Sequence, residues 1–183
     1  MVYALRVSLS GIKGFFRLYH VHGDTTLYTF HRQLRADLEF PQDQLIMFKA
    51  LTADGGVVGR YGLFDLGSGT CDQVTLAAVL KQGAVQFVYF YDVTNRKSVN
   101  ITLEGEVEAS SATAASPLLV EVKGPNPIEF ENGYVAFEDL PAKERHLPGE
   151  GEYEDFDDDD DEDEDAEPED DDEEGKEIYD ENE

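Results

Sequence analysis

The chain has 183 residues and a formal net charge of −27, with 41 acidic residues against 14 basic ones. Residues 150–183 hold 24 of the acidic residues and one Lys, which leaves residues 1–149 with 17 acidic against 13 basic residues, a net of −4. The single cysteine excludes an intrachain disulfide and a multi-cysteine zinc site, and no apolar run approaches the length that crosses a bilayer. We therefore expect a cytoplasmic protein with one folded domain, residues 1–148, and a disordered acidic tail, residues 149–183.

Two antiparallel strands are predicted at the start of the chain. Apolar residues alternate over residues 2–9, and an aromatic-rich segment follows over residues 15–22, with Gly11 and Gly14 bracketing the turn between them. Alternation with a period of two is typical of strands with one buried face.

A helix is predicted next, because apolar residues recur at steps of three and four. These residues are Leu27, Phe30, Leu34 and Leu38. The N-cap candidates are Asp24, Thr25 and Thr26, and Pro41 is expected to end the helix.

The middle of the chain predicts a hairpin and a second helix. Strands over 45–51 and 57–64 are joined by a Gly-rich turn that favours positive φ. The loop over 65–72 precedes a short helix over 75–82, which Thr75 caps and Gly83 closes.

Three further strands complete the pattern. Residues 85–91 are apolar on nearly both faces, which predicts the central strand, and residues 99–103 alternate as a strand with one wet face. A strand over 118–122 precedes a turn at 124–127, and residues 134–140 suggest a helical turn. Paired strands with short links favour an α+β fold with a mostly antiparallel sheet and two helices, in the order strand-strand-helix-strand-strand-helix-strand-strand.

Three segments stand out in chain order: YALRVSLSGIKGFFRLYHV, TTLYTFHRQLRADLEF and QLIMF. Together with later segments of the chain, they resemble the plasmid pRiA4b ORF-3-like family over roughly residues 3–140. In YALRVSLSGIKGFFRLYHV, Phe16 stands where the family usually has Trp, and Arg17 matches. TTLYTFHRQLRADLEF keeps the family's Thr-Leu and Leu-His steps, with His31 in register, and QLIMF is similar to its His-Leu-x-x-Phe strand.

The family's most specific signature is similar to YFYDVTNRKSVNITLE, in which Tyr91 and Asp92 fit. The Phe, Gly, Asp, Trp and His that the family places after them are replaced here. PNPIEFENGY is similar to a Pro-Pro-Glu-Asp segment followed by Gly-Tyr, and the positions that match are Pro127, Glu129, Gly133 and Tyr134. The resemblance implies the fold of a divergent member, and it implies a link to mobile elements or nucleic-acid processing through labels carried by some members.

His20, His22 and Asp24 lie two residues apart, so on an extended strand they project to one face and form a weak candidate metal site without an identifiable further ligand. An enzyme built on His20, His22 and Asp92 is a further hypothesis. For His31 we expect a packing or capping role near the domain edge, in which its ring forms a hydrogen bond. Cys71 has no neighbouring His or Lys in sequence to lower its pKa and is expected to be inert.

The sequence predicts a non-enzymatic interaction protein without a cofactor or a membrane partner, and it leaves the oligomeric state open. Basic residues in the domain are dispersed, and the tail would compete for any basic groove, so direct nucleic-acid binding is disfavoured. The tail has three interpretations: a solubilising appendage, a weak multivalent Ca²⁺ or Mg²⁺ binder, or a ligand for basic proteins. In the last case its apolar anchors would be Tyr153, Phe156, Ile178 and Tyr179. The alternative function is an accessory role in mobile-element or nucleic-acid processing, as the resemblance implies.

Overall fold

The computed structural model describes residues 1–145, so the predicted tail and its boundary after residue 148 lie outside the described residues. The strands are β1 (Val2–Leu9), β2 (Ile12–His22), β3 (Met47–Leu51), β4 (Val57–Gly62), β5 (Gln86–Asp92), β6 (Lys97–Val107) and β7 (Leu118–Lys123). The helices are α1 (Leu27–Asp37), α2 (Leu76–Lys81) and α3 (Pro127–Glu131), followed by the 3₁₀ turns η1 (Phe137–Asp139) and η2 (Ala142–Glu144).

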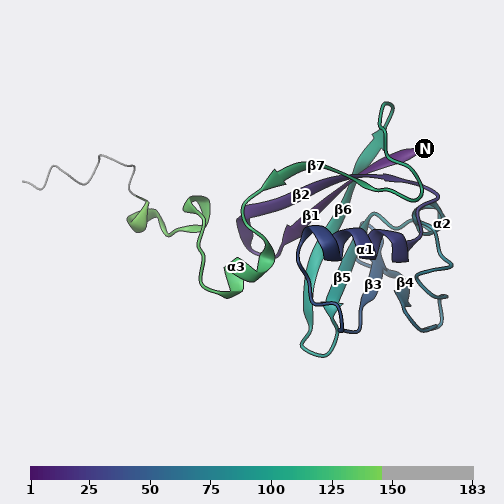
Figure 1. Cartoon of the computed structure of the whole chain (residues 1–183), viewed down its shortest axis with the longest axis horizontal. Coiled ribbons are helices and arrows are strands. Elements are labelled where there is room, and N and C mark those ends of the chain that lie inside the picture. Colours follow the sequence, from purple (N-terminus) through teal and green to yellow (C-terminus); the bar gives the residue numbers. More distant parts are fainter. Residues whose placement is uncertain (146–183) are drawn as a thin grey trace, which may run out of the picture. The chain divides into compact units, whose positions relative to one another are not determined.

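The seven strands form one sheet in the order β4-β3-β5-β6-β1-β2-β7, and each neighbouring pair is antiparallel. Figure 1 shows α1 lying across this sheet. The predicted α+β fold with a mostly antiparallel sheet is confirmed. Among residues 1–145, no helix is both long and apolar enough to cross a membrane.

The core lies between one face of the sheet and the helices. Along β2, Phe15, Tyr19 and Val21 are buried, whereas Phe16 and Leu18 on the opposite face are half-buried. Helix α1 contributes a buried stripe of Leu27, Phe30, His31 and Leu34. The apolar residues that alternate along the strands and those that recur every three to four positions along α1 therefore pack together in one core.

Strand β5 is an interior strand between β3 and β6, but the middle strand of the seven is β6. Burial along β5 alternates, since Phe87, Tyr89 and Tyr91 are buried while Val88 and Phe90 are half-buried. The predicted central strand is therefore an interior strand one place from the middle of the sheet, because apolar residues on both faces indicate an interior position but do not fix the strand order.

Helix α1 begins at its predicted cap and ends earlier than predicted. The Thr26 hydroxyl accepts a hydrogen bond from the Thr29 backbone N–H at 3.1 Å. The helix ends at Asp37, because Glu39 takes the left-handed conformation (φ 56°) and the Phe40 N–H donates back to the Arg35 carbonyl at 3.1 Å. This is a Schellman motif, so Pro41 follows the helix end and does not cause it.

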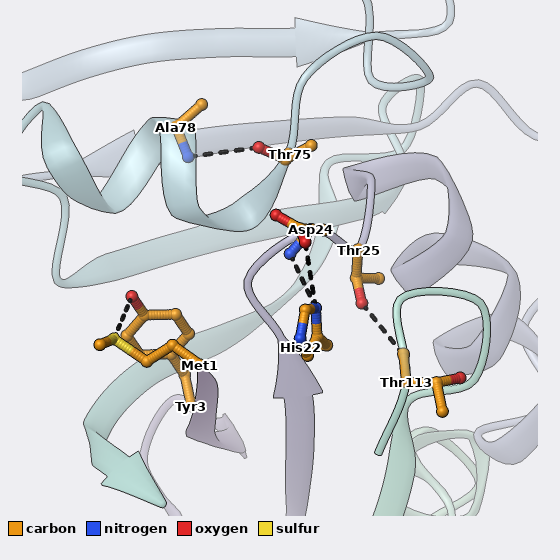
Figure 2. Close-up of polar contacts among 8 residues, drawn as sticks. All are labelled: Met1, Tyr3, His22, Asp24, Thr25, Thr75, Ala78 and Thr113. Atoms are coloured by element: carbon orange, nitrogen blue, oxygen red, sulfur yellow. Dashed lines mark hydrogen bonds and ion pairs between the residues drawn. The ribbon is translucent and has the colours of Figure 1, made fainter.

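Helix α2 matches its prediction. Figure 2 shows the Thr75 hydroxyl beside the Ala78 backbone nitrogen, at 3.3 Å. Gly83 follows the helix with φ 93°, a conformation that glycine adopts without steric cost.

Helix α3 lies where the sequence indicated only a turn. Pro127 occupies its first turn, where no backbone N–H is needed. Gly133 (φ 97°) ends it, and the Tyr134 N–H donates to the Glu129 carbonyl at 2.9 Å in a second Schellman motif. The start and stop signals were present in the sequence, but five residues are too few to show a helical period.

The turn η1 packs against the start of β2. The Asp139 carboxylate accepts the Lys13 N–H at 2.7 Å and the Gly14 N–H at 2.9 Å. A Cβ at Gly14 would overlap the Ala136 side chain, so only glycine permits this approach. The carboxylate thus satisfies two backbone donors of β2 that lie before its pairing with β7 begins.

Candidate functional site

The structure does not bring the three candidate metal ligands together. His20 Nδ1 lies 3.1 Å from the Ser110 hydroxyl oxygen. His22 Nδ1 accepts the Asp24 backbone N–H at 3.2 Å and lies 3.7 Å from the Asp24 carboxylate (Figure 2). In the part of the chain that the structure describes, no group of three or more His, Cys, Asp or Glu side chains could hold a metal ion.

The hypothetical enzyme site is also dispersed. His20 and His22 belong to β2, and Asp92 ends β5. Strands β6 and β1 lie between these two strands, so the groups are separated by about 14 Å of sheet at about 4.8 Å per strand. Asp92 instead accepts the Asn95 backbone N–H at 3.1 Å and the Asn95 side-chain amide at 2.7 Å, which holds the turn between β5 and β6. These Asn95 bonds lower the pKa of Asp92.

A cleft of about 100 Å³ lies where the end of α1, the end of β5 and α3 meet. It is lined by Glu39, Phe40, Pro41, Tyr91, Asp92, Lys97, Ile128 and Glu131. Tyr91 and Asp92 were family-motif positions, whereas the other six were not predicted as site residues. The lining carries three carboxylates against one ammonium, which favours cationic groups over anionic ones.

An aromatic pair forms one wall of this cleft. The rings of Phe40 and Tyr91 stack with centroids 3.8 Å apart and planes inclined by 6°. The Tyr91 hydroxyl donates a hydrogen bond to one carboxylate oxygen of Glu131 at 3.1 Å. The other oxygen of that carboxylate accepts a hydrogen bond from Lys97 Nζ at 2.9 Å. Burial, with the Glu131 charge beside it, raises the pKa of Tyr91, so the phenol stays a neutral donor.

Arg17 is linked to the cleft through Asn126, which bonds Glu39 of the lining, and it joins distant segments. Its guanidinium is buried and donates to the backbone carbonyls of Phe16 (2.9 Å), Lys123 (2.7 Å) and Gly124 (3.0 Å). It also donates to the Asn126 side-chain oxygen at 2.9 Å. Burial lowers the pKa of Arg17 without neutralising a group with so high an ordinary pKa. This family-motif residue therefore fixes the path of the chain between β7 and α3.

Four residues that sequence reasoning missed make further contacts near Arg17, namely Asn126, Glu39, Tyr19 and Asp37. The Asn126 amide nitrogen donates to Glu39 at 2.8 Å, and this draws the side chain away from capping α3. The Tyr19 hydroxyl donates to Asp37 at 2.9 Å. Burial and the nearby Asp37 carboxylate raise the pKa of Tyr19. Asn126 before Pro127 was a recognisable helix-start signal. Its partners Arg17 and Glu39 are distant in sequence, so no local pattern could indicate them.

His31 lies in the core rather than near the domain edge. Its Nδ1 shares a hydrogen bond with the Tyr89 hydroxyl, with the two atoms 2.6 Å apart. Burial, with smaller contributions from Arg35 and Arg32, lowers the pKa of His31 to about 4, so the ring is neutral near pH 7. The expected packing role with a hydrogen bond agrees with this geometry.

The remaining family-motif positions make structural contacts. The Arg6 guanidinium lies 4.3 Å from the centre of the Phe16 ring. Tyr134, after the helix-ending Gly133, packs edge-on against Phe130 with ring centroids 5.3 Å apart. Glu129 is exposed in the first turn of α3, where a carboxylate is favoured by the helix dipole. The motif thus encodes helix starts, helix ends and packing.

Cys71 is buried, and burial raises the pKa of its thiol to about 11. The thiolate, which is the reactive form, is therefore scarce near neutral pH. This environment agrees with the expected inert thiol.

Comparison with known proteins places this arrangement in a family. The sequence profile of the plasmid pRiA4b ORF-3-like protein matches residues 1–173. The chain belongs to the plasmid pRiA4b ORF-3-like family. The match is longer than the predicted 3–140 and runs into the acidic segment, so most of that segment lies within the span of the family profile.

One solved structure shares the fold of this pRiA4b ORF-3-like chain. It is the crystal structure of MM3350, a protein of unknown function from Methanosarcina mazei Go1. The two chains are 18% identical with a TM-score of 0.53, over 72% of this chain and 78% of that one. At this identity the likeness concerns the fold alone. No curated protein sequence matches the chain.

Proposed function

We propose that this protein is a non-enzymatic interaction module whose acidic segment, residues 150–183, captures a basic protein. The observation that carries the proposal is the segregation of charge, because this segment holds −23 of the net −27. A run of like charges attracts an oppositely charged surface over about a Debye length, roughly 8 Å at physiological salt.

The described part of the chain supports a scaffold role. The family-motif side chains Arg17, His31, Tyr91 and Asp92 are engaged in bonds that hold segments together. These bonds satisfy the polar groups of the four side chains within the fold, which supports a structural role for them.

The experiment is affinity capture from the native cell with three baits, followed by identification of the captured proteins. The baits are the full chain, a chain with every Asp and Glu of 150–183 replaced by Asn and Gln, and a chain in which Tyr153, Phe156, Ile178 and Tyr179 are replaced by Ser. The full chain should retain basic proteins that the neutralised chain loses. Loss with the third bait as well would show that apolar anchors in the segment contribute.

Binding of one captured protein, and of duplex DNA, is then measured over a salt series. The protein should bind more weakly as salt rises, and DNA should not bind at any salt concentration. Equal capture by the full and neutralised chains would assign the segment a solubilising role. Tight DNA binding would favour the nucleic-acid-processing alternative.

A further inference from the structure

A second cleft at one end of the sheet has a different chemistry from the one described above. It is a hollow of about 200 Å³ beside the junction of β3, β4 and the turn after β5. We call it the apolar hollow, and its lining includes Leu45, Met47, Leu63, Phe64, Leu66 and Val93. Nearly all of the lining surface is apolar, in contrast to the carboxylates of the first cleft.

The rim of the apolar hollow exposes large hydrophobic side chains. Phe64 is 71% exposed, more than any other large hydrophobic residue among residues 1–145. Leu45, Leu63 and Leu66 are 53%, 41% and 52% exposed. Single exposed apolar residues are ordinary, but a contiguous group around a hollow is typical of an interaction site.

The loop that carries this rim is held by hydrogen bonds. The Asp65 carboxylate accepts the Gly67 N–H at 2.7 Å and the Gly69 N–H at 3.0 Å. The Cys71 N–H donates to the Gly62 carbonyl at 2.9 Å, which returns the loop to the end of β4. These bonds restrain the backbone that presents Phe64 and Leu66, which lowers the loop entropy lost on binding.

Size and charge select the occupant. The volume of about 200 Å³ is below the roughly 300 Å³ at which small-molecule sites begin, and it suits one aliphatic or aromatic side chain. The net charge of −27 repels acidic partners and a second copy of this chain. Asp65 lies between Phe64 and Leu66 in the sequence, so the loop that carries the rim also carries a carboxylate, which favours basic residues in the partner.

We propose that the apolar hollow receives an aliphatic or aromatic side chain from a basic protein segment. This inference rests on the proposed function for the identity of the partner. The two surfaces would act differently, because charge chiefly speeds association whereas burial of an apolar anchor slows dissociation.

The test uses two synthetic peptides that differ at one position, a run of Lys residues with either Phe or Ser at its centre. The proteins are the full chain, Phe64→Ser, and Val122→Ser as the matched control. Val122 is 56% exposed and lies on β7, at the opposite edge of the sheet. Thermal melts establish that both variants are folded, which is expected because both side chains are largely exposed.

The full chain should bind the Phe peptide about tenfold more tightly than the Ser peptide, equivalent to about 1.4 kcal/mol. Phe64→Ser should reduce this ratio to about one, and Val122→Ser should preserve it. Salt should weaken both peptides together and leave the ratio unchanged. A ratio of one for the full chain, or a ratio that survives Phe64→Ser, would overturn the proposal.

The chain with a neutralised 150–183 segment separates this proposal from the proposed function. If neutralisation leaves the affinity for the Ser peptide unchanged, the charge-capture role fails, whereas a persisting Phe-to-Ser ratio still supports the apolar hollow. Self-association in sedimentation that Phe64→Ser abolishes would identify a second copy as the occupant and overturn the assignment to a basic segment.

Discussion

Arg17 and Asn126 are 109 positions apart in sequence, and their side chains form a hydrogen bond of 2.9 Å. This contact joins β2 to the start of α3. The Asn126 amide nitrogen also donates a hydrogen bond to Glu39, just after the end of α1. Three segments that lie far apart in the sequence are therefore joined through the side chains of Arg17 and Asn126.

Replacement of Arg17 by Ala should strongly destabilise the fold. The change leaves the Lys123 and Gly124 carbonyls and the Asn126 amide oxygen without their donor, and hydrogen bonds to a charged group contribute about 1.5–3 kcal/mol each. We expect a loss of about 3 kcal/mol or more in the free energy of unfolding, measured by urea denaturation.

Arg6→Ala is the control for this prediction. Arg6 pairs with Glu104 at the surface, where both side chains are more than one-third exposed. Removing this pair together with the contact of Arg6 over the Phe16 ring should cost about 2 kcal/mol or less. Equal losses for the two variants would contradict the role assigned to Arg17.

Phe87→Ala should cost about 3–5 kcal/mol, because Phe87 is buried on the core face of an interior strand. Phe90→Ala, on the opposite face of the same strand, should cost less than about 2 kcal/mol, because Phe90 is only half-buried. Chemical denaturation of both variants measures the difference. A larger loss for Phe90 would place the core on the other face of β5.

Local patterns in the sequence were sufficient for most of the fold. Alternating apolar residues located the strands, and the caps at Thr26 and Thr75 located the helix starts, because these signals act between near neighbours. Local patterns did not predict the position of β5 in the sheet. They also did not predict that α1 ends before the left-handed residue Glu39. Strand order depends on long-range pairing, and a left-handed Glu is uncommon enough that Pro41 was the better local signal.

The candidate site was less predictable than the fold. Arg17, Tyr91 and Asp92 were singled out through the family resemblance, but their partners Asn126, Glu131 and Asn95 were not. Asn95 is close in sequence, yet its role depends on the turn that it forms. The partners Asn126 and Glu131 are supplied by α3, which was predicted only as a turn.

Gly14→Ala should detach the segment that carries η1 from the sheet. The added Cβ overlaps the Ala136 side chain and would break the two hydrogen bonds that Asp139 accepts from Lys13 and Gly14. Amide hydrogen exchange should show lost protection at Leu140 and at the Lys13 N–H. The double variant Gly14→Ala with Ala136→Gly removes the overlapping Cβ and should restore much of the protection. Unchanged exchange in the single variant would refute the close approach.

Removal of residues 150–183 should leave the domain folded. The described elements and their core end before this segment, and the deletion changes the net charge from −27 to −4. Thermal unfolding at moderate salt should give similar midpoints for the two chains. At low salt the shorter chain should be the more stable, because self-repulsion is removed. A much lower midpoint for the shorter chain at moderate salt would show that the segment contributes to the fold.

His31 should make stability depend on pH. Its pKa is about 4 in the folded protein against an ordinary value of 6.5, so the unfolded chain takes up a proton first as the pH falls. The stabilisation from the neutral ring is complete above about pH 6.5 and is lost as the pH falls towards 4. Between pH 7 and pH 5 we expect a loss of about 2 kcal/mol.

His31→Gln isolates this contribution, because the amide can still bond the Tyr89 hydroxyl but does not titrate. Urea denaturation of both proteins at pH 7, 6 and 5 gives the free energy of unfolding at each pH. The stability difference between the native chain and the variant should shrink steadily as the pH falls, because only the native chain loses the neutral-ring contribution. Carboxylates common to both proteins cancel in this difference. A difference that stays constant from pH 7 to pH 5 would show that His31 titrates at an ordinary pKa and that the His31–Tyr89 contact opens to water.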